Sequence, residues 1–208
     1  MGNLWLYAMP LEDVRAFFSA PADLADELLA QAGAVIKAPT NNLLGRVGPL
    51  FRHPVVPVID LPMPSADDAQ NLVEGRSIAP ERLAPAWTIV RHWCDVRAAG
   101  RLSLEISQQQ LSTIDFHIVS GGLSSQFSLE TIVGRDPHLP LRTLHGSQVG
   151  WMPAAHAALA AEQWPTALAD GRLPDDVIGL AEQLCGFFCQ VPDWSANGQS
   201  ADVLALLQ

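Results

Sequence analysis

Residues 3–9 constrain the fold more than any other segment, because they are apolar on both alternating faces. Leu4, Leu6 and Ala8 alternate with Trp5, Tyr7 and Met9. A strand with two apolar faces is usually a central one that is covered on both sides. Pro10 ends the pattern and suits the first position of a helix. We therefore expect a central N-terminal strand followed by a helix.

Amphipathic segments with recognisable ends predict that most of the remaining chain is helical. In one of them, Ser65 precedes Asp68 at the spacing of a capping box and Gly75 closes the helix. A longer helix opens at Pro85, ends at Gly100 and carries a core stripe that includes Val96. Further helices are expected at residues 11–18, 21–33, 128–133, 153–169 (with an interruption possible at Pro165), 174–190 and 202–207.

Residues 111–119 fit two structures. Leu111, Ile114 and Ile118 have helical spacing, whereas Ile114, Phe116 and Ile118 alternate as in a strand. Ser107 and Gln110 form a second capping signal just before this segment, so we expect a helix.

Residues 39–64 contain six prolines, which exclude a helix and most central strands. We expect a long loop there, with residues 55–61 as a possible edge strand. The chain of 208 residues is 49% hydrophobic and suffices for one full core. The sequence thus predicts one α+β domain over residues 1–208, mainly helical, with a small sheet that includes the N-terminal strand.

The charge balance limits the partners. Asp and Glu number 22 against 12 Lys and Arg, which gives a net charge of −10. Such a surface repels phosphate backbones, so we expect neither nucleic acid nor a membrane as partner, and a basic protein is the easier case. The chain shows no signal peptide and no apolar run long enough to cross a bilayer, so we expect a cytoplasmic location.

Motifs for cofactors and metals are missing from the sequence. It has no glycine-rich phosphate loop, no His-Glu zinc signature and no Gly-x-Ser-x-Gly elbow. Cys185 and Cys189 are four residues apart, half of a metal site, but no His or Cys is close by in the sequence to complete it. We expect no cofactor and no metal, with these thiols and Cys94 reduced.

The best candidate site is the segment at residues 135–151, which we expect to be a loop that carries polar side chains and a tryptophan, Trp151. Loops often carry binding and catalytic groups. Trp194 is also expected in a loop, and like Trp151 it is a candidate for binding a protein partner, because tryptophan is enriched among the residues that contribute most to interfaces. The His92–Asp95 pair, three residues apart, is a weaker candidate for a general base. The candidate binding residues are Arg135, Asp136, His138, Arg142, His145, Trp151 and Trp194.

Several short segments resemble an uncharacterised family of bacterial proteins of the actinobacterial type. They are residues 6–11 with the following helix, residues 65–75, residues 134–141 and the triplet Gly150-Trp151-Met152. The resemblance implies no assigned activity. Some small acidic proteins of this general kind are immunity partners of secreted toxins.

Two main functions follow as hypotheses, beside a third, that of a homo-oligomeric structural protein. The first is a non-catalytic cytoplasmic binding protein, such as an immunity or interaction protein, for a basic protein partner. The alternative is a hydrolase or transferase with its site in residues 135–151, around Asp136, His138 and His145. The sequence leaves the oligomeric state open.

Overall fold

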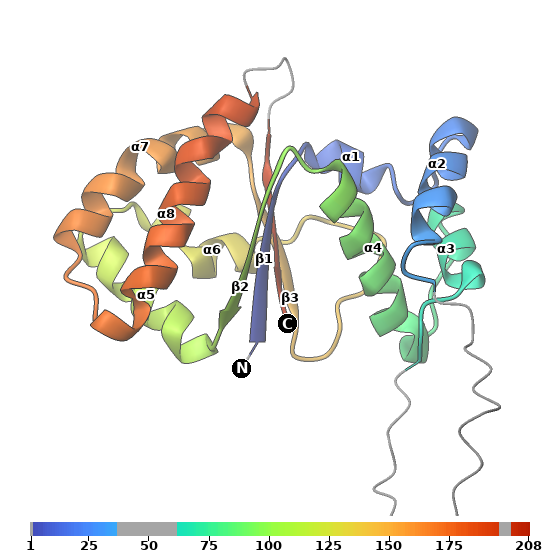
Figure 1. Cartoon of the computed structure of the whole chain (residues 1–208), viewed down its shortest axis with the longest axis horizontal. Coiled ribbons are helices and arrows are strands. Elements are labelled where there is room, and N and C mark those ends of the chain that lie inside the picture. Colours follow the sequence, from blue (N-terminus) through green and yellow to red (C-terminus); the bar gives the residue numbers. More distant parts are fainter. Residues whose placement is uncertain (1, 37–61, 196–200) are drawn as a thin grey trace, which may run out of the picture.

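An antiparallel sheet of four strands separates two layers of helices (Figure 1). The structure is a computed structural model and describes residues 2–36, 62–195 and 201–208. The strands are β1 (Gly2–Ala8), β2 (Gly100–Ile106), β3 (Gln148–Met152) and β4 (Val203–Leu207), in the order β2-β1-β4-β3. The predicted α+β domain, mainly helical with a small sheet that includes the N-terminal strand, is confirmed.

Each face of the sheet has its own helical layer. The α1–α4 layer contains α1 (Leu11–Arg15), α2 (Ala22–Ala32), α3 (Ala66–Val73), the 3₁₀ turn η2 (Pro80–Arg82) and α4 (Leu83–Arg97). The α5–α8 layer contains α5 (Gln108–Ser120), η3 (Ser125–Phe127), α6 (Leu129–Gly134), α7 (Ala154–Asp170) and α8 (Asp175–Ser195).

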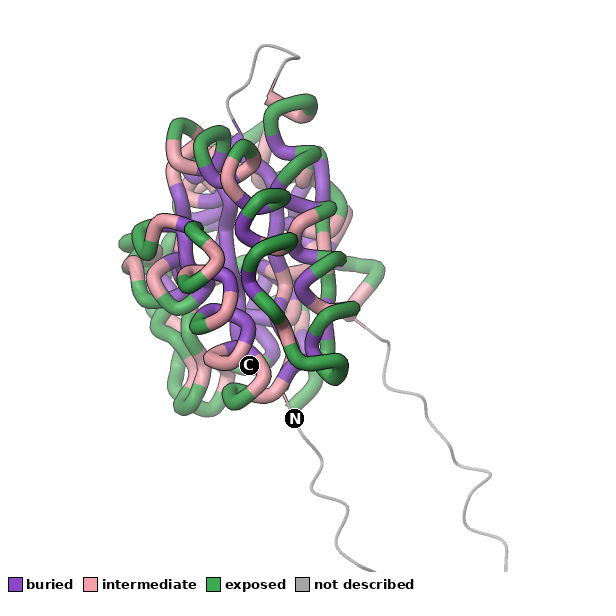
Figure 2. The backbone as a smooth tube through the Cα atoms, turned by 90° about the vertical axis from the view of Figure 1, so that its left-hand side faces the viewer, coloured by how far each residue is buried: buried purple, intermediate pink, exposed green. Residues whose placement is uncertain are grey.

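The two apolar faces of β1 build two separate cores. Leu4 and Leu6 pack with the α5–α8 layer, whereas Tyr7 packs with the α1–α4 layer, and all three are fully buried. β1 lies between β2 and β4, so the predicted central strand is confirmed. Figure 2, with the α5–α8 layer toward the viewer, shows buried residues behind the exposed outer turns of the helices.

Both predicted capping boxes are present. The Ser65 side chain accepts from the backbone N–H of Asp68, whose carboxylate accepts from the N–H of Ser65. Ser107 and Gln110 make the same reciprocal contacts at the start of α5. Residues 111–119 therefore lie in a helix, with Leu111, Ile114 and Ile118 buried.

The last predicted helix, at residues 202–207, is wrong. This segment is β4, which pairs with β1 on one side and β3 on the other. All five residues of β4 are buried because helices cover both faces of the sheet, and the run therefore lacks the alternation of a half-buried strand. Strands β2 and β3 were not anticipated at all.

Two details of the helices also differ from expectation. α4 begins at Leu83, two residues before Pro85, and Val96 is 52% exposed instead of lying in the core stripe. α7 continues through Pro165 without a break. Most of the predicted loop at 39–64, including the possible strand at 55–61, lies outside the described residues. No helix in the described ranges is both long and apolar enough to cross a membrane.

Candidate functional site

The predicted loop segment connects α6 to the edge strand β3, and three contacts hold it in place. Arg15 of α1 donates to the carbonyl of Pro137 through Nε (3.3 Å) and Nη2 (2.9 Å). The indole N–H of Trp87 in α4 donates to the carbonyl of Arg142 at 2.8 Å. At the other end, the N–H of Trp151 donates to the carbonyl of Arg135 at 3.2 Å. The loop is thus tied to the α1–α4 layer and to the sheet.

Asp136 and His138 form a local pair on the surface of this loop. One carboxylate oxygen of Asp136 accepts from the N–H of His138 at 2.7 Å, and the other lies 3.2 Å from Nδ1 of the imidazole. His138 has a φ of 53°, a left-handed conformation that the Asp136 contact supports. Both side chains are more than 70% exposed (79% and 72%), so water screens their interaction.

The structure brings some predicted residues together and separates another. Arg135 lies 3.4 Å from the imidazole of His156, while Arg142 and His145 are exposed. Trp151 belongs to β3 and packs against the α1–α4 core, so it is only partly exposed. Trp194 lies in α8 and packs on Phe187, with ring centroids 5.4 Å apart. It also contacts Gly100 of β2, the strand at the opposite edge of the sheet from β3.

A shallow hollow of about 470 Å³ borders the same loop, and Asp136, Thr143 and Ser147 are among its polar lining residues. A hydrolase would require the Ser147 hydroxyl within hydrogen-bond reach of an imidazole. Among the described residues, Ser147 makes no such bond with His138 or His145, and neither histidine lines the hollow. The arrangement fits a binding surface better than a nucleophile with its base.

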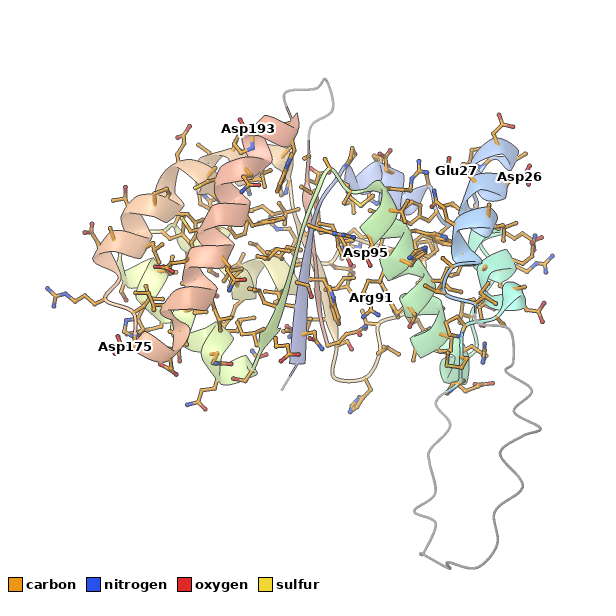
Figure 3. The ribbon with its side chains drawn as sticks, in the orientation of Figure 1. Asp26, Glu27, Arg91, Asp95, Asp175 and Asp193 are labelled. Carbon is orange, nitrogen blue, oxygen red and sulfur yellow. The ribbon has the colours of Figure 1, made fainter. Side chains whose placement is uncertain are left out.

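The His92–Asp95 pair does not form a dyad, because its members have other partners. The imidazole Nε2 of His92 lies 3.1 Å from the carbonyl of Gln31, and Asp95 accepts from the hydroxyl of Tyr7 at 3.0 Å. Burial, together with the charge of Asp95, raises the pKa of Tyr7 far above its usual value, so the hydroxyl stays protonated. Figure 3 shows Asp95 and Arg91 directed from α4 toward the sheet.

The thiols of Cys185 and Cys189 are free and face each other across one turn of α8, with sulfurs 3.9 Å apart. Burial, and the neighbouring Cys189, raise the pKa of Cys185 to about 11, so this thiol is a poor nucleophile at neutral pH. Within the described ranges, no three His, Cys, Asp or Glu side chains are grouped so that they could hold one metal ion.

Helices α7 and α8 carry a surface that the sequence analysis did not single out. Neither helix contains Lys or Arg, and no acidic side chain on them lies within ion-pair distance of a described base. Figure 3 shows two of these acids, Asp175 and Asp193, at opposite ends of α8. We define the α7–α8 face by its six exposed acids, Glu162, Asp170, Asp175, Asp176, Glu182 and Asp193.

The α1–α4 layer has exposed acids without an ion pair as well, Asp23, Asp26, Asp67 and Glu81 among them, but it also contains ion pairs with arginine. Arg15 pairs with Glu12, and Arg97 of α4 pairs with Glu27 of α2, each at 2.7 Å. Arg82 pairs with the buried Asp68. The sequence alone does not show which acids form ion pairs, because that depends on distances between helices. The lack of Lys and Arg in residues 154–170 and 175–195, however, is visible in the sequence.

Comparison with models of known protein families, with curated proteins and with solved structures finds no match. The resemblance to a bacterial family therefore stays a prediction, and the function has to be inferred from the surface of this chain.

Proposed function

We propose that this protein is a non-catalytic binding protein that receives a basic protein partner on the α7–α8 face. The face carries six exposed acids on two adjacent helices, and Arg172, in the loop that joins the helices, forms no ion pair with any of them. The net charge of −10 adds a long-range attraction for a cationic partner. Such complementarity speeds association and makes it sensitive to salt.

The placement of Asp170 and Asp193 carries the proposal. Both residues lie in the last turn of their helix, and neither last turn contains a basic residue. Carbonyl groups give a helix C-terminus partial negative charge, so an acid there is unfavourable by about 0.3–1 kcal/mol. Fold stability therefore does not account for these two acids, whereas attraction of a basic partner does.

Exposed apolar side chains on the same two helices supply contacts that charge alone does not. Leu159 of α7 is 45% exposed and Ile178 of α8 is 43% exposed. Protein interfaces combine a desolvated apolar centre with a polar rim, and charges at the rim act chiefly on the association rate. Leu159 and Ile178 are the side chains that a bound partner would remove from water.

The finer form of the proposal is an immunity or interaction protein of the cytoplasm. An immunity protein binds one toxin tightly and has no need for a reactive group of its own. A gene for a basic secreted protein beside the gene for this chain would support that form.

The test is capture of a partner from a lysate of the source organism at low and at high salt. The variant Asp170→Asn/Asp193→Asn removes two charges from the α7–α8 face, and the matched control Asp26→Asn/Glu81→Gln removes two exposed charges from the other layer. We expect a basic partner that is released by salt, is bound about tenfold more weakly by the first variant and is retained by the control. No basic partner, or equal weakening by both variants, would contradict the proposal.

A further inference from the structure

Strand β2 has an outer edge with no partner among the described residues. It pairs with β1 only, and Leu4 lies opposite Leu104 in that register. Asn3 exchanges both backbone hydrogen bonds with Gln208, which shows that the odd-numbered residues of β1 bond toward β4. The even-numbered residues therefore bond toward β2, and in β2 the backbone groups of Arg101, Ser103 and Glu105 point outward.

The outward-pointing residues of β2 are complementary to themselves. If a second β2 runs antiparallel to the first with Ser103 opposite Ser103, all seven residues of the strand overlap. Arg101 of each copy then lies opposite Glu105 of the other, on the same face of the sheet. Opposite charges directly across a strand pair stabilise it, and like charges destabilise it. Registers centred on Arg101 or on Glu105 place like charges together and shorten the overlap.

The surfaces on either side of the β2 edge are compatible with a second copy of the chain beside it. On one side, Trp194 of α8 covers Gly100 of β2. The same helical stripe continues through the exposed, uncharged Gln190, four residues before Trp194, and Gln183, seven residues before Gln190. On the other side, a groove of about 380 Å³ lies between α4 and the sheet, lined by Trp5, Tyr7, Asp95 and Arg101.

We infer that two copies of this chain form a symmetric dimer by pairing their β2 strands into one eight-stranded sheet. The interface is isologous, as two-fold symmetry requires: each Arg101 meets the partner's Glu105, and the backbone groups at Ser103 bond to their counterparts. The pairing also removes the exposed edge, which otherwise invites uncontrolled association.

The dimer leaves the α7–α8 face free. A two-fold axis perpendicular to a continuous sheet keeps the same side of both sheets on the same side of the dimer, so the two acidic faces point in one direction. A basic partner with two sites would then gain affinity by binding both copies. The inference does not depend on such a partner, since it rests on β2 alone.

The test is the mass of the full-length protein by sedimentation velocity over a range of concentrations, with charge reversals in β2. We expect the wild type to sediment as a dimer at high concentration. Arg101→Glu alone, or Glu105→Arg alone, places two like-charge pairs in the interface and raises the dimer dissociation constant about tenfold. An equimolar mixture of the two single variants restores both opposite-charge pairs, so it forms a mixed dimer at wild-type strength.

A backbone variant separates edge pairing from side-chain contact. The N–H of Ser103 points away from β1, so Ser103→Pro removes a bond of the dimer and none of the sheet, while Ser103→Thr keeps the N–H. Circular dichroism of each variant checks that the monomer is folded. A wild type that stays monomeric, or a dimer that is unaffected by the single reversals and by Ser103→Pro, would overturn the inference.

Discussion

The α1–α4 layer and the α5–α8 layer each bury one carboxylate among the described residues, but they compensate it differently. Asp68 (3% exposed) receives hydrogen bonds from Arg82 and Ser65. Asp115 (6% exposed) has no basic partner in the part of the chain that the structure describes, and it accepts hydrogen bonds from the N–H groups of Leu129 and Glu130, both at 2.7 Å, at the start of α6. The first layer thus stabilises its buried carboxylate with an arginine, whereas the second stabilises its own with backbone N–H groups.

The two buried carboxylates have opposite pKa shifts as a consequence. Burial alone would raise the pKa of Asp68, but the hydrogen bonds from Arg82 and Ser65 outweigh it and lower the pKa below the usual value. Burial raises the pKa of Asp115, and the N–H groups of Glu130 and Leu129 offset only part of that effect. At Asp68 the hydrogen bonds from Arg82 and Ser65 thus reverse the effect of burial on the pKa, whereas at Asp115 the effect of burial prevails.

The largest effect is expected from Arg82→Ala, which leaves Asp68 buried without its cation. Loss of one partner of a buried ion pair should lower the free energy of unfolding by about 3 kcal/mol. Arg76→Ala is the control, because its ion pair with Glu74 is exposed and contributes about 0.5 kcal/mol or less. Urea denaturation measures both. Equal small losses would show that the ion pairs of this layer are not structural.

A somewhat smaller loss, about 2 kcal/mol, is expected from Asp115→Ala, since two backbone N–H groups at the start of α6 lose their acceptor. Asp115→Asn keeps one acceptor oxygen and should lose less. Glu162→Gln, on the surface of the same layer, should leave stability unchanged within about 0.5 kcal/mol. An Asp115→Ala protein as stable as this control would mean that water replaces the carboxylate without cost.

The two acids should also give opposite pH dependences. The lowered pKa of Asp68 means that its contribution is present above pH about 4 and is lost as the pH falls through the folded-state pKa. The raised pKa of Asp115 means that its contribution is present below pH about 4 and is lost as the pH rises through the folded-state pKa.

Urea denaturation of wild type, Asp68→Asn and Asp115→Asn over a pH series reads this difference directly. The stability lost on Asp68→Asn should shrink toward acid pH, and that lost on Asp115→Asn should shrink toward neutral pH. If the stability lost on substitution changed with pH in the same direction for both variants, the assigned pKa directions would be wrong.

The smallest effect concerns the surface acids of the second layer. Asp170→Asn/Asp193→Asn should raise the free energy of unfolding by about 1 kcal/mol, because both acids lie in last turns. Asp175→Asn/Asp176→Asn should lower it by a similar amount, because these acids lie in the first turn of α8. Thermal denaturation at low salt measures both. A loss of stability in the first variant would show that these acids have a structural role.

Local signals were enough to predict most of the helices, and distant pairing explains the failures. The caps at Ser65 and Ser107 satisfy backbone groups within three residues, so the sequence alone reveals them. β4 becomes a strand because it pairs with β1, whose residues are about two hundred positions earlier in the chain. In β2, Leu102, Leu104 and Ile106 do alternate with polar residues, a signal that was present and not used.

The candidate site, like the fold, was predicted only in part. Residues 135–147 do form a loop beside a hollow, yet the side chains of Trp151 and Trp194 pack partly into the protein. The α7–α8 face could not be recognised without the structure, because a row of acids in a sequence does not show which arginines lie near it.

Hydroxyl-radical footprinting of the captured complex tests the central claim most directly, since it reports the exposure of individual side chains. Leu159 and Ile178 mark the α7–α8 face, and Val96 and Met63, which are 52% and 54% exposed, mark the other side of the sheet. We expect the partner to protect Leu159 and Ile178 and to leave Val96 and Met63 as reactive as in the free protein. Protection of Val96 and Met63, with Leu159 and Ile178 unchanged, would contradict the account.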